Sequence, residues 1–234
     1  MSSQKVDVSV VLAHGAWADG SSWSKVIGLL KAASVKAVVA APLPLTSLAD
    51  DVAALDRTLE RVDGPVVLAG HAYAGAVIGS THNPKVRALA YIAALAPAEG
   101  ETVAEVFYRN TPHPQAPQLA PDAHGLIWLP DSAFASAFAQ NANAEELAVL
   151  AAAQRPIAAP CIGAPVGRQR WQDVPSWYLV AQDDRMIVAD TQVFMAQRMQ
   201  AQIRTHAVDH APLVTAPEAV AQTILEAVEQ VAGK

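Results

Sequence analysis

The 234-residue sequence has little of several features that mark whole classes of protein. A single cysteine, Cys161, excludes an internal disulfide and is typical of a reducing cytoplasm. With 16 basic and 22 acidic residues there is no basic stripe, so we expect no nucleic-acid partner. No apolar run approaches the roughly 20 residues that span a bilayer, and residues 1–7 lack the apolar core of a signal peptide. These absences predict a cytoplasmic protein that contacts neither membrane nor nucleic acid.

Strand-like and helix-like segments alternate along the chain. Continuous runs of Val, Ile, Leu and Ala are typical of buried parallel strands, and amphipathic stretches between them are typical of covering helices. We therefore expect an α/β fold, with a mostly parallel central sheet and helices on both of its faces. The expected strands are residues 6–13, 36–40, 65–69, 88–95, 176–181 and 203–208. The expected helical stretches are residues 22–33, 47–62, 72–81, 190–200 and 217–231.

The stretch from about residue 101 to 175 departs from this alternation. Its proline-rich part, residues 111–121, is incompatible with a regular helix or a central strand. Two short helices are expected further on, over residues 132–140 and 143–154. Asn143 and Glu146 have the spacing of a capping box at the start of the second helix. We interpret the stretch as a small helical cap inserted into one domain of residues 1–234.

A further absence concerns a nucleophile. Residues 65–69 are followed by Gly70-His71-Ala72-Tyr73-Ala74 and then by a helix-like stretch, which is the context of a nucleophile elbow. The central residue of an elbow is Ser, Cys or Asp. Here it is Ala72, whose methyl group cannot attack a carbonyl carbon. We interpret the sequence as a serine-hydrolase scaffold without its nucleophile.

Two other residues continue the chain order of such a site, in which nucleophile, acid and histidine follow one another. His210 comes just after the last expected strand, where parallel sheets carry functional groups; taken alone, it would be a surface loop histidine. The acid is expected at Asp184, with Asp183 as the alternative that spacing leaves open. A solvated cluster in which Arg185 pairs with either aspartate is the competing interpretation.

Backbone N–H groups are expected to stabilise the negative oxygen that forms during acyl transfer. One N–H belongs to Tyr73, after the nucleophile position, and the other to Ala16, in the loop after the first strand. Gly15 in that loop allows a substrate to approach closely. We expect Gly15, Trp17 and, from the cap, Trp128 to bind the substrate.

Neither a metal nor an organic cofactor is expected. His206 and His210 have the spacing of a metal pair only on a helix, and this segment is expected to be a strand followed by a loop. The oligomeric state is not predicted by any pattern in the sequence.

Four motifs of the sequence are His14-Gly15-Ala16-Trp17, Gly70-His71-Ala72-Tyr73-Ala74-Gly75, Asp183-Asp184-Arg185-Met186-Ile187 and Asp209-His210. They resemble motifs of the α/β-hydrolase superfamily. More narrowly, they resemble its small esterase branch, which includes plant salicylate-binding methylesterases, hydroxynitrile lyases and bacterial relatives. The resemblance covers residues 5–100 and 175–231, implies the α/β-hydrolase fold, and places the acid at Asp184. The chain departs from the lyases, which have a threonine where Gly15 stands and a lysine where Ala211 stands.

Motifs and resemblance together predict hydrolysis of a small, largely apolar carboxylic ester or lactone by the serine form of this site. Three explanations of Ala72 compete. The favoured one is an engineered serine-to-alanine change, because the motifs around position 72 are those that an active enzyme would need. The second is a natural pseudo-enzyme that binds a ligand without turnover. The third is a nucleophile-independent lyase or cofactor-free oxygenase that uses His210 as its base.

Overall fold

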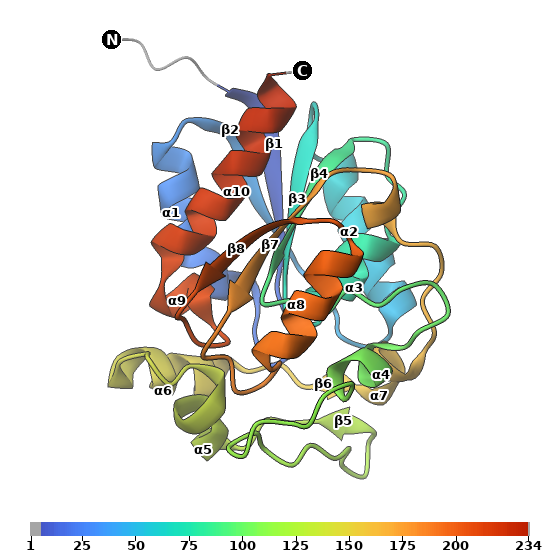
Figure 1. Ribbon diagram of the computed structural model, residues 1–234. Coiled ribbons are helices and arrows are strands. Elements are labelled where there is room, and N and C mark those ends of the chain that lie inside the picture. Colours follow the sequence, from blue (N-terminus) through green and yellow to red (C-terminus); the bar gives the residue numbers. More distant parts are fainter. Residues whose placement is uncertain (1–5, 234) are drawn as a thin grey trace.

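A parallel sheet forms the centre of the computed structural model, which describes residues 6–233. The sequence predicts that residues 1–7 lack the core of a signal peptide, and five of these residues, 1–5, lie outside the described residues. The sheet has six strands in the order β2-β1-β3-β4-β7-β8 (Figure 1), and all neighbouring strands are parallel. The strands are β1 (Val6–Ala13), β2 (Val35–Ala41), β3 (Val66–His71), β4 (Val86–Ile92), β7 (Ser176–Ala181) and β8 (Gln202–His206). This confirms the expected α/β architecture.

Helices cover both faces of the sheet (Figure 1). On one face, α1 (Ser24–Ala32) packs against α10 (Pro217–Ala232). The other face carries α2 (Leu48–Glu60), α3 (Ala74–Ser80) and α8 (Ala189–Arg198). Because both faces are covered, every residue of β3 and of β7 is buried.

The buried face of α2 differs from the pattern that its sequence predicts. Apolar spacing predicts Leu48, Val52, Leu55 and Leu59 on that face. In the structure Val52 is only partly buried, whereas the carboxylate residue Asp51 is fully buried. The helix begins after Ser47, whose hydroxyl accepts a hydrogen bond from the backbone N–H of Asp50 at 3.1 Å, as expected of an N-cap.

The segment between β4 and β7 lies across the carboxyl ends of the strands, at the bottom of Figure 1. Its elements are α4 (Val103–Phe107), β5 (Leu126–Ile127), α5 (Asp131–Ala133), α6 (Ala144–Ala153), β6 (Ile157–Ala158) and α7 (Ala159–Gly163). The helix expected over 132–140 is instead α5 followed by a π-helical turn, Phe134–Phe138. The expected capping box of Asn143 and Glu146 starts α6. Cys161, expected in a loop, is buried in α7.

Three short helices complete the described chain. They are a 3₁₀ helix (Gly20–Trp23), another 3₁₀ helix (Arg170–Gln172) and α9 (Pro212–Thr215). Within residues 6–233 there is no helix both long enough and apolar enough to cross a bilayer.

Candidate active site

Ala72 lies in a strained turn between β3 and α3. Its φ angle is 50°, a left-handed conformation that residues with a Cβ atom adopt rarely. The turn is held by its carbonyl oxygen, which accepts hydrogen bonds from the backbone N–H groups of Leu95 at 2.9 Å and Gly75 at 3.1 Å. A Cβ atom at Gly75 would lie 2.3 Å from the carbonyl oxygen of Leu95, so only glycine permits this close approach. Such a strained strand-to-helix turn is the backbone geometry of a nucleophile elbow.

His210 and Asp184 form a buried hydrogen-bonded pair. His210 Nδ1 lies 2.8 Å from Asp184 Oδ2, and both side chains are excluded from solvent. The other carboxylate oxygen, Oδ1, accepts hydrogen bonds from the backbone N–H groups of Met186 at 2.7 Å and Ile187 at 2.8 Å. The side chain of Gln192 donates to Oδ2 at 2.8 Å. All of these groups donate to the carboxylate, which in its ionised form can only accept hydrogen bonds. The His210 nitrogen that faces it, Nδ1, must therefore carry the proton of the neutral ring.

Of the two neighbouring aspartates, the structure brings Asp184 to His210. The side chain of Asp183 is exposed, and its carbonyl oxygen accepts a hydrogen bond from Gln140 Nε2 at 2.7 Å. Arg185 does not pair with either aspartate among the described residues; it donates to the carbonyl oxygen of Ser136 at 2.7 Å. The competing interpretation, a solvated charge cluster, is therefore wrong for Asp184.

Gln192 is a member of this network that no sequence motif indicates. From α8 its Nε2 group also donates to the carbonyl oxygen of Ile187 at 2.7 Å, while Oε1 accepts from the backbone N–H of Ala181 at 2.9 Å. The side chain thus links the end of β7 to the loop that carries Asp184. In sequence, a glutamine in an amphipathic helix looks like a surface residue, so only the tertiary structure reveals the contacts of Gln192.

A second histidine supports the loop of the first. His71 Nε2 donates to the carbonyl oxygen of His210 at 2.7 Å, and the two rings are 4.9 Å apart. Burial, and then repulsion from His210, lower the pKa of His71 to about 3. The ring is therefore neutral at physiological pH and acts as a fixed hydrogen-bond donor.

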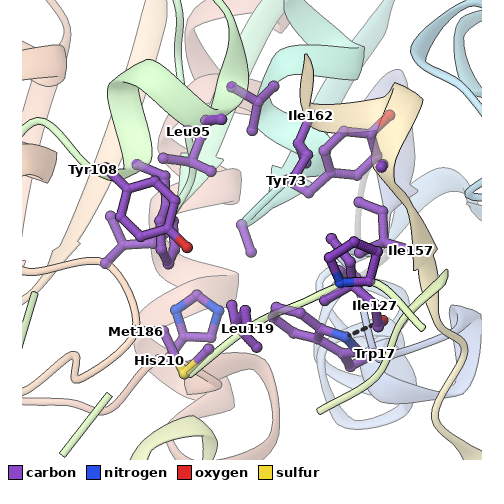
Figure 2. Close-up of a pocket in the computed structure, with 18 residues that line it drawn as sticks. Trp17, Tyr73, Leu95, Tyr108, Leu119, Ile127, Ile157, Ile162, Met186 and His210 are labelled. Carbon is purple, nitrogen blue, oxygen red and sulfur yellow. Dashed lines mark hydrogen bonds between the residues drawn. The ribbon is translucent and has the colours of Figure 1, made fainter. Parts of the chain in front are cut away.

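A cavity of about 290 Å³ lies beside Ala72 and His210 (Figure 2). This volume is at the lower end of the roughly 300–1,000 Å³ of typical ligand sites. Its wall is almost wholly apolar and comes from both the sheet's loops and the 101–175 segment. Among its lining residues are Leu95, Val103, Phe107, Tyr108, Leu119, Ile127, Ile157, Ile162, Met186 and Ile187.

Of the three residues expected to bind substrate, one lines the cavity and two do not. Trp17 lines the cavity (Figure 2). Gly15 is not among the lining residues; it lies behind Ala72, and a Cβ atom at Gly15 would be 3.0 Å from that of Ala72. Trp128 is 47% exposed and outside the cavity, with its indole N–H donating to Asp122 at 3.2 Å. Side chains alternate along an extended chain, so Ile127 points inward and Trp128 outward.

Ala16 and Tyr73, whose backbone N–H groups are expected to bind an oxyanion, both line this cavity, as does Ala72. Neither backbone N–H has a hydrogen-bond acceptor within the described part of the chain. Two unpaired donors at one apolar cavity are available to a ligand oxygen.

Behind Tyr73 lies a buried carboxylate that sequence reasoning missed. Asp51 Oδ2 accepts a hydrogen bond from the Tyr73 hydroxyl at 2.7 Å, and Oδ1 accepts from the backbone N–H of Leu45, also at 2.7 Å. The thiol of Cys161 lies 3.7 Å from Oδ2. Burial raises the pKa of Asp51. Beside Asp50, at the start of an amphipathic helix, Asp51 looks like an ordinary exposed residue.

No group of three or more His, Cys, Asp and Glu side chains within residues 6–233 is arranged to hold a metal ion. His206 and His210, whose spacing suggests a metal pair only on a helix, lie on β8 and in the loop that follows it.

The profile of the alpha/beta hydrolase family matches residues 10–223, so the chain belongs to that family. No curated protein matches its sequence. Polyneuridine aldehyde esterase is 19% identical, with a TM-score of 0.82 over 94% of this chain and 99% of that one. A pyrethroid hydrolase from Sphingobium faniae JZ-2 is 22% identical, with a TM-score of 0.79 over 97% and 100%.

A third similar structure is a His-to-Ala variant of tomato methylketone synthase I complexed with beta-ketoheptanoate. It is 16% identical, with a TM-score of 0.82 over 96% of this chain and 99% of that one. At these identities the likeness shows the fold alone. The expected α/β-hydrolase fold is confirmed.

Proposed function

We propose that this chain is the scaffold of a serine hydrolase for a small, largely apolar carboxylic ester or lactone, with its nucleophile position occupied by Ala72. The observation that carries the proposal is the hydrogen-bonded pair of His210 and Asp184 at the same cavity as the strained turn of Ala72. The unpaired N–H groups of Ala16 and Tyr73 support it. Segment 101–175 acts as the cap that gives the cavity its apolar wall.

In the serine form, the hydroxyl at position 72 would attack the ester carbonyl carbon while its proton moves to Nε2 of His210. Asp184 holds the ring with Nδ1–H toward itself and stabilises the imidazolium. The carbonyl oxygen becomes negative and accepts hydrogen bonds from Ala16 and Tyr73. His210 then protonates the departing alkoxide. Water attacks the acyl group, gives a proton to His210, and releases the carboxylic acid.

With Ala72 no acyl-enzyme forms, because the methyl group has neither a lone pair nor a proton to transfer. The present chain is therefore expected to bind such esters and to hydrolyse them slowly. Whether alanine arose by engineering or in nature, the expected behaviour of the protein is the same.

The test is hydrolysis of short p-nitrophenyl esters by the chain and by Ala72→Ser, side by side. We expect kcat/KM to rise by about 10³-fold or more with serine. The matched control is Ala72→Ser combined with His210→Gln, which keeps the hydroxyl but removes the base. An Ala72→Ser protein that folds but gains no activity over this control would refute the proposal.

A second candidate function needs no nucleophile. Nδ1 of His210 is taken by Asp184, whereas its Nε2 atom has no hydrogen-bond partner within the described residues. With no hydroxyl at position 72 to occupy Nε2, that atom is free to exchange a proton directly with a ligand. We infer that such a reaction would form an enolate, whose oxygen the Ala16 and Tyr73 amides would stabilise.

Decarboxylation of a beta-keto acid fits this description. The bond between the carboxylate and its neighbouring carbon breaks, CO₂ leaves, and the electron pair passes to the ketone oxygen. His210, whose Nε2 has taken the carboxyl proton of the bound acid, then gives that proton to the carbon, and a methyl ketone results. An apolar wall disfavours the localised carboxylate charge more than the delocalised enolate.

Beta-ketoheptanoate, the compound in the complex with the methylketone synthase variant, is a suitable probe. We would measure 2-hexanone against the spontaneous background, with the unchanged chain and with His210→Gln. Production above background that is lost in His210→Gln would favour this function over the first. Equal rates with both proteins would exclude it.

A further inference from the structure

A second cavity lies on the other side of Trp17. Its volume is about 340 Å³; it is partly open to solvent and is lined by residues of the first 3₁₀ helix, α1 and α6. Unlike the cavity beside Ala72, it has charged and hydroxyl side chains in its wall, among them Asp19, Ser22, Lys25 and Glu146. Of the residues that line the two cavities, Trp17 is common to both.

Trp17 is held in place from two directions. Its backbone N–H donates to the carbonyl oxygen of Arg155 at 2.9 Å, and its indole N–H donates to that of Ile127, also at 2.9 Å (Figure 2). The edge of its ring meets Phe138, with ring centroids 6.4 Å apart. Both hydrogen-bond acceptors belong to the 101–175 segment, so the indole is a fixed wall between that segment and the sheet.

The backbone of Trp17 supports the same conclusion. Its φ angle is 58°, in the left-handed region, which is unusual for a bulky residue. Such strain persists only where surrounding contacts impose it, and it clusters at ligand sites. Here the two hydrogen bonds and the ring contact impose it, and the result is a side chain that closes the cavity beside Ala72.

We propose that Trp17 sets the upper limit on the chain length of ligands that bind beside Ala72, by separating that cavity from the second one, whose wall also contains the apolar side chains of Val149 and Leu150. A linear acyl chain fills the apolar cavity and then meets the indole. Replacing the indole by a small side chain joins the two cavities, and longer chains are then accommodated. The inference rests on the proposed function only in that an ester binds beside Ala72.

The experiment uses the present chain, which is expected to bind esters without consuming them. Isothermal titration calorimetry would give affinities for methyl esters from butanoate to decanoate, with the unchanged protein, Trp17→Ala and Trp17→Phe. Each added methylene that is buried raises affinity by about fourfold. We expect this increase to stop at one chain length in the unchanged protein and in Trp17→Phe, which keeps a ring in the wall. In Trp17→Ala it continues for at least two further methylenes.

A double variant separates this explanation from general loosening of the site. In Trp17→Ala combined with Ala153→Phe, a ring refills the second cavity, which Ala153 lines. The original chain-length limit is then expected to return. Trp17→Leu, a milder truncation, serves if Trp17→Ala does not fold.

The outcomes distinguish the two proposals. Esters that fail to bind the folded, unchanged chain would overturn the proposed ester-binding function. Binding with the same chain-length limit in the unchanged chain and in a folded truncation variant would overturn the role of Trp17 alone. A longer limit that persists in the double variant would also overturn it, because the additional chain would then lie elsewhere.

Discussion

His71 is expected to make the stability of the protein depend on pH. Burial and the neighbouring His210 lower the pKa of the folded-state ring to about 3, whereas an unfolded histidine has a pKa of about 6.5. Between these values the unfolded chain binds a proton at residue 71 and the folded chain does not. The free energy of unfolding therefore falls as pH falls. This contribution is fully present above about pH 6.5 and is lost progressively toward pH 3.

The size of the loss in stability depends on how far the pH falls below the pKa of His71 in the unfolded chain. Each pH unit below the unfolded pKa removes about 1.4 kcal/mol from the free energy of unfolding. Lowering the pH from 7.5 to 5 therefore removes about 2 kcal/mol through His71 alone. That is a substantial part of the ~5–15 kcal/mol that stabilises a typical domain. Urea unfolding at pH 7.5, 6 and 5, followed by the fluorescence of the five tryptophans, measures it.

The matched variant is His71→Gln, which does not titrate but keeps an N–H donor for the carbonyl oxygen of His210. Burial also lowers the pKa of His14, but that contribution is present in both proteins and cancels in the comparison. Between pH 7.5 and 5 the variant is expected to lose about 2 kcal/mol less than the unchanged chain. Equal losses in the two proteins would show that the folded state does not hold His71 neutral.

Two further substitutions test the packing of the site. Gly75→Ala would place a Cβ atom 2.3 Å from the carbonyl oxygen of Leu95; we expect the free energy of unfolding to fall by about 1–3 kcal/mol in urea titrations, and an unchanged midpoint would contradict the close approach. Gln192→Leu removes a donor to Asp184 and leaves the N–H of Ala181 without its acceptor. Unfolding should become easier by about 1–3 kcal/mol, and a neutral result would mean that water replaces the amide.

The parts of the site that sequence predicts are those encoded locally. Residues 65–75 contain a buried apolar strand, the small residues of a tight turn and the start of a helix, so one short window predicts the position of Ala72. His210 follows a strand of a parallel sheet, and the carboxyl ends of such strands meet at one edge. Each of these predictions needs only the periodicity of neighbouring residues.

Parts that depend on distant contacts are not predictable in this way. Asp183 and Asp184 have the same chemistry, so spacing leaves the choice open; only the resemblance to the family places the acid at Asp184, the carboxylate that the chain after β7 brings to His210. Asp51 is satisfied by Tyr73, 22 residues away in sequence, and has no local signal of burial. Trp128 is expected to bind the substrate, but the alternation of side chains around β5 points it outward.

The strain at Ala72 connects the two candidate functions. A left-handed residue with a Cβ atom costs about 1–3 kcal/mol, and here Leu95 and Gly75 impose that conformation through the backbone. Because backbone contacts hold the turn, it does not depend on which small side chain occupies position 72. Serine there would project its hydroxyl from the place where the methyl group now stands, beside His210 in the cavity wall. If the two proposals hold, one oxygen atom decides whether Nε2 of His210 activates a nucleophile or exchanges a proton with the ligand directly. Ala72→Ser is then expected to exchange one activity for the other within an unchanged scaffold.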